Sequence, residues 1–352
     1  MKNLLRILII ATFFGIIIYY TSVEQDISEP LRGPNSSTQA IPRTEVEELS
    51  LYLPRPQEGM STLIGKEVAF LLQQYGTPTR IEQSGFQYNW WIYVKDFEFI
   101  MFSVQNDIVT QVYTNSMRHN VAPYSIGQSI DEILRMTIVE TEIAVTINDT
   151  IYMFLMDEMD LKTRLLVAFE DVFAQLYIDN ETNKLIGIRF IDGETLVKHK
   201  PYEFQYIGEM THQAVPSSFK QSTIDLAYAN QIYNLANEFR LLNDLPKLLR
   251  SPILNEVAME HSEYMALKDL NSMEEEIITL EGRLEEKNVT YKKMGENLAV
   301  DYNDAIEVIH GWMNSKEHRD TLLNEKYNIS GTGVYLNNFT QVLIEKEALT
   351  YN

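Results

Sequence analysis

Residues 294–334 read MGENLAVDYNDAIEVIHGWMNSKEHRDTLLNEKYNISGTGV. Ile306, Ile309 and Met313 recur at three- and four-residue spacing, which is typical of the buried face of a helix. Asp304, or the asparagine before it, is the expected N-cap of that helix. The run SGTGVYLNNFTQVLIEK predicts two strands joined by an Asn-Asn turn. A helix followed by paired strands predicts an α+β fold for this part of the chain.

The same stretch carries residue types of acid–base and metal chemistry. A carboxylate such as Glu296 can orient and charge an imidazole such as that of His318. Ser262 and Ser315 are the nearby candidate nucleophiles. His310 lies too far along the helix from His318 to share one ion with it, so we expect His310 to be a partly exposed helix residue.

A structural interpretation accounts for the other conspicuous side chains of this region. Trp312 is expected to be a core anchor. Asn297 is expected to hydrogen-bond a neighbouring backbone group, and Arg319 to pair with an acidic side chain. Both contacts are expected to tie the loop after Gly295 to the helix.

Two helices are predicted upstream of this stretch. Apolar side chains, beginning with Tyr228 and Ile232, recur every three to four residues, with Ser222 or Thr223 as the expected cap. The second helix is expected to begin near Pro252, because proline suits the first helical turn.

The C-terminal third resembles the bacterial form of the CAP superfamily, which includes cysteine-rich secretory, antigen 5 and pathogenesis-related 1 proteins. The resemblance is carried by five motifs in order: NEFRLLNDLPKL, LNEVAMEHSEYM, GENLA, WMNSKEHRDTLLN and YNISGTGVY. It implies an α/β/α sandwich over residues 222–348, with a cleft built around histidines and glutamates.

The chain departs from the family pattern at one cleft position. Met273 stands where the first histidine of the family normally lies, whereas Glu296 and His318 match the family's glutamate and second histidine. One imidazole and one carboxylate make a poor zinc site, because stable zinc centres need three or four ligands, and methionine sulfur suits Cu(I) better. We therefore predict no metal or cofactor, and a cleft formed by Met273, Glu296, Asn297, His318 and Arg319.

The middle of the chain predicts a second α+β domain, residues 62–210, with an internal duplication. Gly65 and Gly127 each precede a segment of helical periodicity, and alternating strand-like runs follow each one. The adjacent Trp90 and Trp91 suggest either a ligand surface or core packing, and we favour the core. This region resembles the N-terminal domain that precedes CAP domains in bacterial membrane-anchored proteins, from which no activity follows.

The N-terminus, residues 1–23, predicts a membrane anchor. Basic residues precede an apolar run of about 20 residues and acidic residues follow it, which places the rest of the chain outside the cytoplasm. Cleavage as a signal peptide, giving a secreted protein, is the alternative, but Tyr19 and Tyr20 occupy positions where cleavage prefers small residues. The proline-rich residues 24–61 are expected to form a flexible linker.

The composition of the chain argues against several classes of function. A formal net charge of -21 disfavours nucleic acid, and the absence of cysteine excludes disulfides and thiolate chemistry. We expect a membrane-tethered protein that binds a lipid, a cell-wall component or a protein at the cell surface. A hydrolase that uses the cleft on protein or wall peptides is the alternative, and we favour the non-enzymatic reading.

Overall fold

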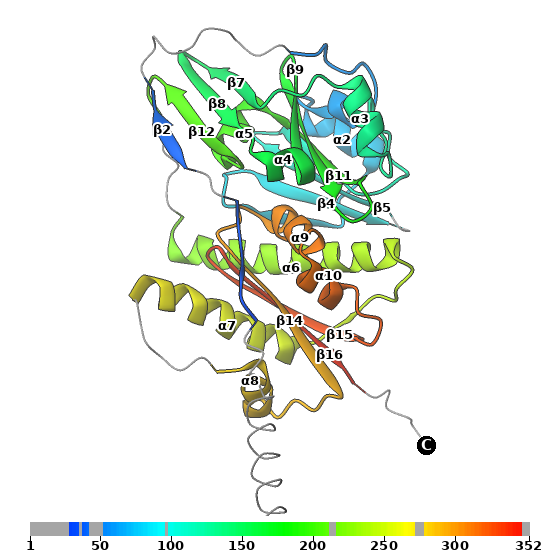
Figure 1. Ribbon diagram of the computed structural model, residues 1–352, viewed down its shortest axis with the longest axis vertical. Coiled ribbons are helices and arrows are strands. Elements are labelled where there is room, and N and C mark those ends of the chain that lie inside the picture. Colours follow the sequence, from blue (N-terminus) through cyan, green and yellow to red (C-terminus); the bar gives the residue numbers. More distant parts are fainter. Residues whose placement is uncertain are drawn as a thin grey trace, which may run out of the picture.

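The computed structural model describes residues 28–34, 37–41, 52–95, 98–210, 216–271 and 278–346, which form a mixed α/β structure with three sheets (Figure 1). The predicted anchor and Met273 lie outside these residues. Within the described ranges, no helix is both long enough and apolar enough to cross a bilayer.

The C-terminal part is a five-stranded sheet between two layers of helices. The strand order is β1 (Leu31–Arg32), β14 (Lys293–Val300), β16 (Asn338–Glu345), β15 (Ile329–Tyr335) and β13 (Leu249–Arg250). The helices are α6 (Ser218–Leu242), α7 (Pro252–Asn271), α8 (Leu280–Glu286), α9 (Ala305–Met313) and α10 (Lys316–Leu322). The expected three-layer sandwich is confirmed.

Alternation along the strands assigns the helices to the two faces. A Cβ at Gly333 would meet the backbone of α7, whereas the neighbouring Thr332 hydroxyl donates to the Ala229 carbonyl of α6 at 2.8 Å. Because successive side chains point to opposite faces, α7 and α6 cover opposite faces. Helix α8 packs with α7 in one apolar cluster, and α9 packs with α6 in another.

Helix starts follow local capping chemistry. The Asp304 carboxylate accepts from the Glu307 amide at 3.0 Å, so the cap expected for α9 is confirmed. The cap expected for α6 is wrong, because this helix begins at Ser218 with Ser217 as its N-cap. The hydroxyls of Ser222 and Thr223 instead donate to carbonyls one turn back, as is usual inside a helix.

The N-terminal part has two sheets. The larger has the order β3 (Arg80–Gln83), β4 (Asn89–Lys95), β5 (Glu98–Gln105), β6 (Ile108–Thr114), β11 (Lys184–Asp192), β10 (Val172–Asp179) and β9 (Arg164–Phe169). The smaller has the order β2 (Thr38–Ala40), β12 (Glu203–Ile207), β8 (Thr150–Leu155) and β7 (Glu142–Ile147). Short helices complete it: η2 (Met60–Leu63), α2 (Val68–Tyr75), α3 (Ile130–Met136), α4 (Glu158–Thr163) and α5 (Gly193–His199).

The two glycine–helix segments occupy equivalent places in the large sheet. The Gly65 amide donates to the Val109 carbonyl of β6, and the Gly127 amide donates to the Leu185 carbonyl of β11. Both glycines have positive φ, at 83° and 89°, a conformation that glycine adopts without strain. Since β6 and β11 are neighbours, the sequence repeat corresponds to two similar segments side by side.

The segment expected to be a flexible linker is partly ordered. Residues 28–34 and 37–41, which we call the strap, add parallel strands to two sheets: β1 pairs with β14, and β2 pairs with β12. Backbone hydrogen bonds at sheet edges stabilise these strands, which side-chain periodicity does not predict. The prediction of a flexible linker is therefore wrong for the strap.

One apolar cluster joins the two parts of the chain. It contains the fully buried Trp90 and Trp312 together with residues of α6 and α9. Figure 1 shows α6 and α9 between the large sheet and the C-terminal sheet. Core packing is thus confirmed for Trp90, and Trp312 is the expected core anchor.

Candidate functional site

A groove of about 270 Å³ lies on the α7 side of the C-terminal sheet. The strap, α7, α8 and β14 form its walls. Its lining includes His261, Tyr264, Arg283, Glu296, Leu298 and Val300. Polar groups therefore lie beside an apolar wall, as in many sites for small molecules.

Glu296 is a buried carboxylate with one charged partner. Its side chain is 5% exposed, and Oε2 accepts from Arg283 Nη2 at 2.7 Å. Burial raises the pKa of Glu296, and the adjacent guanidinium partly offsets that rise. Because the guanidinium compensates the carboxylate, this arrangement does not resemble a free general base.

His261 lies in the same groove, and sequence reasoning did not identify it as a site residue. Burial, followed by the nearby charge of Arg283, lowers the pKa of His261 to about 3, so the imidazole is neutral near pH 7. The ring stacks on Tyr264 with a centroid separation of 6.0 Å. The sequence signal that could have identified His261 is its position on the apolar face of α7 that packs against the sheet.

His318 lies on the opposite face of the sheet from Glu296. Asn297 follows Glu296 on β14 and points away from the groove, and its Nδ2 donates to the His318 backbone carbonyl at 3.1 Å. The His318 Nδ1 lies 2.9 Å from Ser315 Oγ, and burial lowers the pKa of this histidine. The structure therefore does not bring Glu296 and His318 together.

Arg319 also lies outside the groove. Its guanidinium donates to both carboxylate oxygens of Asp179 on β10, at 2.7 and 3.2 Å, and lies 3.2 Å from the Glu181 carboxylate. An acidic partner was expected, but the contact joins α10 to the N-terminal part rather than to a nearby loop. Such long-range partners carry no local sequence signal.

His310 is buried, so the expectation of partial exposure is wrong. It is 3% exposed, stacks on Tyr177 at 3.9 Å, and places Nε2 2.9 Å from the Tyr113 hydroxyl. Both tyrosines belong to the large sheet, which covers α9. Burial lowers the pKa of His310 well below its usual value.

The chemistry open to these residues is narrow. Ser262 is fully buried, and its hydroxyl donates to the Gly333 carbonyl or to Thr340, so it is not available as a nucleophile. Among the described residues, no three histidine or carboxylate side chains are grouped as metal ligands. The groove can hold a ligand, but it shows no assembled catalytic pair.

Known proteins match both parts of the chain. The CAP-associated N-terminal family matches residues 64–202, and the cysteine-rich secretory protein family matches residues 233–345. The uncharacterized membrane protein YlbC of Bacillus subtilis (strain 168) is 33% identical over 353 residues, which covers 98% of this chain and 100% of that protein.

Two solved structures share the whole arrangement. An extracellular protein with an SCP domain from Bacillus anthracis str. Ames is 31% identical, with a TM-score of 0.77 and coverage of 86% of this chain and 100% of that one. A cysteine-rich secretory protein from Staphylococcus aureus subsp. aureus Mu50 is 27% identical, with a TM-score of 0.77 and coverage of 90% and 98%. The chain belongs to the cysteine-rich secretory protein (CAP) family, in the form that carries a CAP-associated N-terminal domain.

Proposed function

We propose that this CAP-domain protein is a membrane-tethered, extracytoplasmic binding protein that holds a ligand in the α7-side groove without catalysing a reaction there. The observation that carries the proposal is the placement of Glu296 and His318 on opposite faces of the sheet. The groove keeps a neutral His261 and a compensated Glu296, which suit hydrogen bonding and ionic contact better than proton transfer.

The path of the chain supports a groove close to the membrane. Ser28 lines the groove, and the predicted anchor ends at Val23, five residues earlier. Five extended residues span at most about 18 Å. A tether at residues 1–23 would therefore present the groove near the bilayer surface. The membrane designation of YlbC and the extracellular designation of the Bacillus anthracis protein agree with this placement.

The lining favours an amphiphilic ligand. Leu280, Leu298 and Val300 supply apolar wall, while Lys268 supplies positive charge beside the ion pair of Arg283 and Glu296. Apolar contact gives affinity and a few placed polar groups fix orientation. A lipid, or a wall component with both apolar and ionic portions, meets these requirements.

Co-purification tests the proposal. Full-length protein is isolated from membranes, and the small molecules released on denaturation are identified by mass spectrometry. Met265→Trp narrows the groove from the half-buried middle of α7 and is expected to abolish co-purification, whereas Lys316→Gln, on the exposed side of α10, is the matched control. Equal recovery of the same molecules from both variants would remove the groove as the binding site.

One observation favours the hydrolase alternative, namely the contact between Ser315 Oγ and His318 Nδ1. A serine beside an imidazole is the first requirement of nucleophilic catalysis. The pair lies outside the groove, where Ser315 is the N-cap residue of α10. Peptide or ester cleavage that is lost in Ser315→Ala, with unchanged thermal unfolding, would establish this alternative in place of the binding function.

A further inference from the structure

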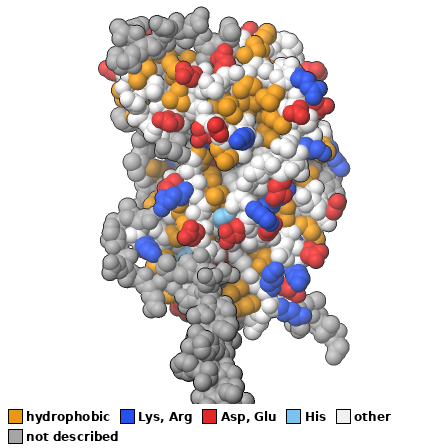
Figure 2. Space-filling model, viewed as in Figure 1, with side chains coloured by type: hydrophobic (Ala, Val, Ile, Leu, Met, Phe, Trp, Pro, Cys, Tyr) orange, Lys and Arg blue, Asp and Glu red, His pale blue; other side chains and the backbone are white. Residues whose placement is uncertain are grey.

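A second, larger cavity lies between the two parts of the chain. Its volume is about 510 Å³, within the usual range of small-molecule sites. The strap, α4, α9 and the β10 residue Tyr177 contribute to its lining. Figure 1 shows the strap running beside α9 and crossing in front of α6. In Figure 2, acidic and basic side chains are interspersed on that face, with histidine atoms visible between them.

Glu307 of α9 is a buried carboxylate in this lining with one oxygen that accepts no hydrogen bond from a described residue. Its side chain is 3% exposed, and Oε2 accepts from Asn303 Nδ2 at 3.2 Å. No described residue hydrogen-bonds Oε1. The nearest guanidinium nitrogen, Arg189 Nη1, lies 4.0 Å away, and Arg189 already donates to both carboxylate oxygens of Asp304 at 2.9 and 2.8 Å. A buried acceptor without a partner destabilises the fold, and a ligand donor would relieve that cost.

His310 presents a second unmatched polar atom in the same lining. Its Nε2 contacts the Tyr113 hydroxyl, whereas its Nδ1 has no hydrogen-bond partner within the described part of the chain. The ring is neutral near pH 7, because burial and then the charge of Arg189 lower its pKa. It therefore adds a polar contact without adding positive charge.

The charges around the cavity favour a cation. Carboxylates outnumber guanidinium groups in the lining, with four of the former and two of the latter. The carboxylates are Asp157, Asp160, Glu203 and Glu307, and the guanidinium groups are Arg32 and Arg164. Both guanidinium groups have acidic partners, Arg164 with Asp160 at 2.6 Å and Arg32 with Asp301 at 3.1 Å. The positive charge of the walls is thus already paired, whereas Glu307 has only the long 4.0 Å contact with Arg189, which binds Asp304 more closely.

The rest of the wall is apolar. Leu31 and Tyr302 lie on the side of the C-terminal sheet, and Leu155, Met156 and Met159 lie on the side of α4. Methionine side chains adapt to ligands of varied shape. A ligand with an apolar chain would contact these residues while its polar end reaches Glu307.

We propose that this cavity binds an organic cation, a primary ammonium on a short apolar chain, with the ammonium donating to Glu307 and to the polar end of the cavity. The inference goes beyond the proposed function, because the cavity is separate from the α7-side groove and uses residues of both parts of the chain. An ethanolamine lipid headgroup and the free amino group of a wall peptide both carry the required group.

Calorimetric titration of the full-length protein in lipid nanodiscs tests the proposal, with n-butylamine as the probe and n-butanol as its neutral analogue. We expect saturable binding of butylamine at least tenfold tighter than that of butanol. Glu307→Gln is expected to remove that preference, while Glu158→Gln keeps it, because Glu158 lies on α4, another helix that lines the cavity, with a 94% exposed side chain. Equal affinity for the two probes, no saturable binding, or an unchanged preference in Glu307→Gln would overturn the proposal.

The pH dependence gives a test that needs no variant. Burial, followed by the charge of Asp304, raises the pKa of Glu307 to about 7, while Arg189, Arg164 and Asn303 oppose the rise. The neutral His310 faces the same cavity. Only the carboxylate attracts an ammonium strongly, so butylamine affinity is expected to rise roughly tenfold from pH 6 to pH 8. A flat profile would contradict the role of Glu307.

The source of the ammonium is then separated by competition. Nanodiscs that contain phosphatidylethanolamine are compared with phosphatidylglycerol nanodiscs, and a lysine amide with a free side-chain amine is added to the latter. Weaker butylamine binding in the phosphatidylethanolamine nanodiscs supports the lipid as the source of the ammonium. Weaker butylamine binding after addition of the lysine amide supports the peptide as the source. The proposed site would be overturned if neither phosphatidylethanolamine nor the lysine amide weakens butylamine binding and the protein also binds butylamine and butanol equally well.

Discussion

The ion pair between Arg189 and Asp304 gives the sharpest energetic prediction. Arg189 on β11 is fully buried, and its Nη2 donates to both carboxylate oxygens of Asp304, which caps α9. Arg189→Gln leaves Asp304 buried without its cation. Breaking a buried pair from one side costs about 3–5 kcal/mol, and we expect a loss of this size.

Removal of the acidic partner, Asp304, should cost less free energy of unfolding than removal of Arg189, because a second carboxylate, that of Glu307, lies nearby. Asp304→Asn keeps a good capping residue and leaves Arg189 with Glu307, 4.0 Å from Nη1. At pH 8 Glu307 is already ionised, because its pKa is about 7, so it supplies a carboxylate for Arg189, and removal of Asp304 also removes the repulsion between the two carboxylates. Each pKa unit corresponds to about 1.4 kcal/mol, so at pH 8 we expect Asp304→Asn to cost about 1–3 kcal/mol. Adding Glu307→Gln to Asp304→Asn should restore the full cost.

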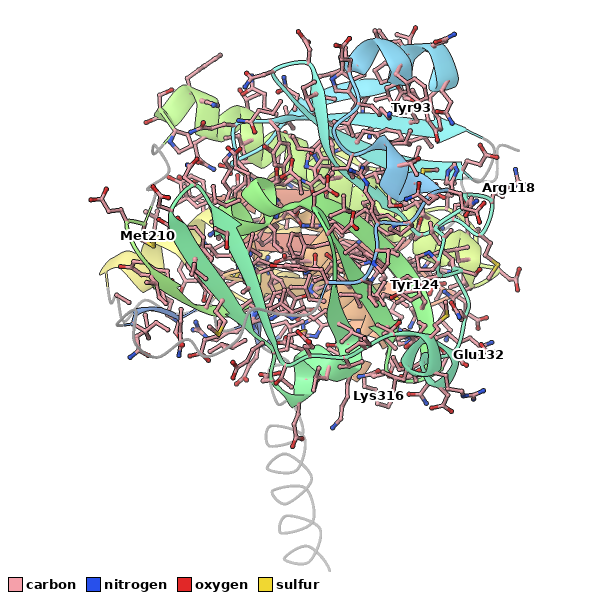
Figure 3. The ribbon with its side chains drawn as sticks, turned by 90° about the horizontal axis from the view of Figure 1, so that it is seen from above. Tyr93, Arg118, Tyr124, Glu132, Met210 and Lys316 are labelled. Atoms are coloured by element: carbon pink, nitrogen blue, oxygen red, sulfur yellow. The ribbon has the colours of Figure 1, made fainter. Side chains whose placement is uncertain are left out.

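Urea unfolding at pH 8, followed by tryptophan fluorescence, measures these differences. Trp90 and Trp312 lie in the apolar cluster that joins the two parts, so both report on this interface. Lys316→Gln is the control, since Lys316 forms an exposed pair at the margin of the molecule (Figure 3) and should give no measurable change. The reasoning is refuted if Asp304→Asn costs as much as Arg189→Gln, or if Glu307→Gln adds nothing to it.

Three further outcomes follow from named contacts. The folded pKa of Glu307 is about 7 against an ordinary 4.5, so its contribution to stability is present below pH 4.5 and is lost as pH rises to 7. Glu307→Gln should therefore gain about 3 kcal/mol relative to wild type between pH 4.5 and 7.5 in urea titrations, and parallel pH profiles would contradict this. A Cβ at Gly33 would overlap the Asp301 carbonyl, so Gly33→Ala should release the strap and speed its proteolysis, whereas an unchanged cleavage rate would count against a docked strap. Asn297→Ala removes the buried side-chain hydrogen bond to the His318 carbonyl and should cost about 1–3 kcal/mol in thermal unfolding, and an unchanged melting temperature would show that the bond is unimportant.

Sequence reasoning succeeded where the signal is local. The helical stripe of Ile306 and Ile309 and the Asp304 cap both depend on a few neighbouring residues. The five CAP motifs likewise identified the sandwich, because each motif is a contiguous segment. The same reasoning placed the α6 cap at Ser222 or Thr223, a few residues too late, because capping residues also occur inside helices.

The candidate site was only half predictable. Because side chains alternate along β14, the sequence predicts that Glu296 and Asn297 point to opposite faces of the sheet. Which helix covers each face depends on how the chain crosses the sheet, and no short motif encodes that. His310 was expected to be partly exposed because Tyr177, its stacking partner, lies in a distant part of the chain. The strap was missed because its strands depend on backbone pairing with sheets formed much later in the sequence.

By itself, the sequence determined the family, the helices and strands of the sandwich, and the residue types available for chemistry, because periodicity, capping and motif order are properties of contiguous segments. The tertiary structure alone decided that Glu296 faces Arg283 and His261 in a groove while His318 packs behind the sheet. It also placed Glu307 and His310 at a cavity between the two parts of the chain. The physical reason is that burial, charge compensation and pKa depend on which distant segments exclude water from a side chain, and only the folded chain specifies them.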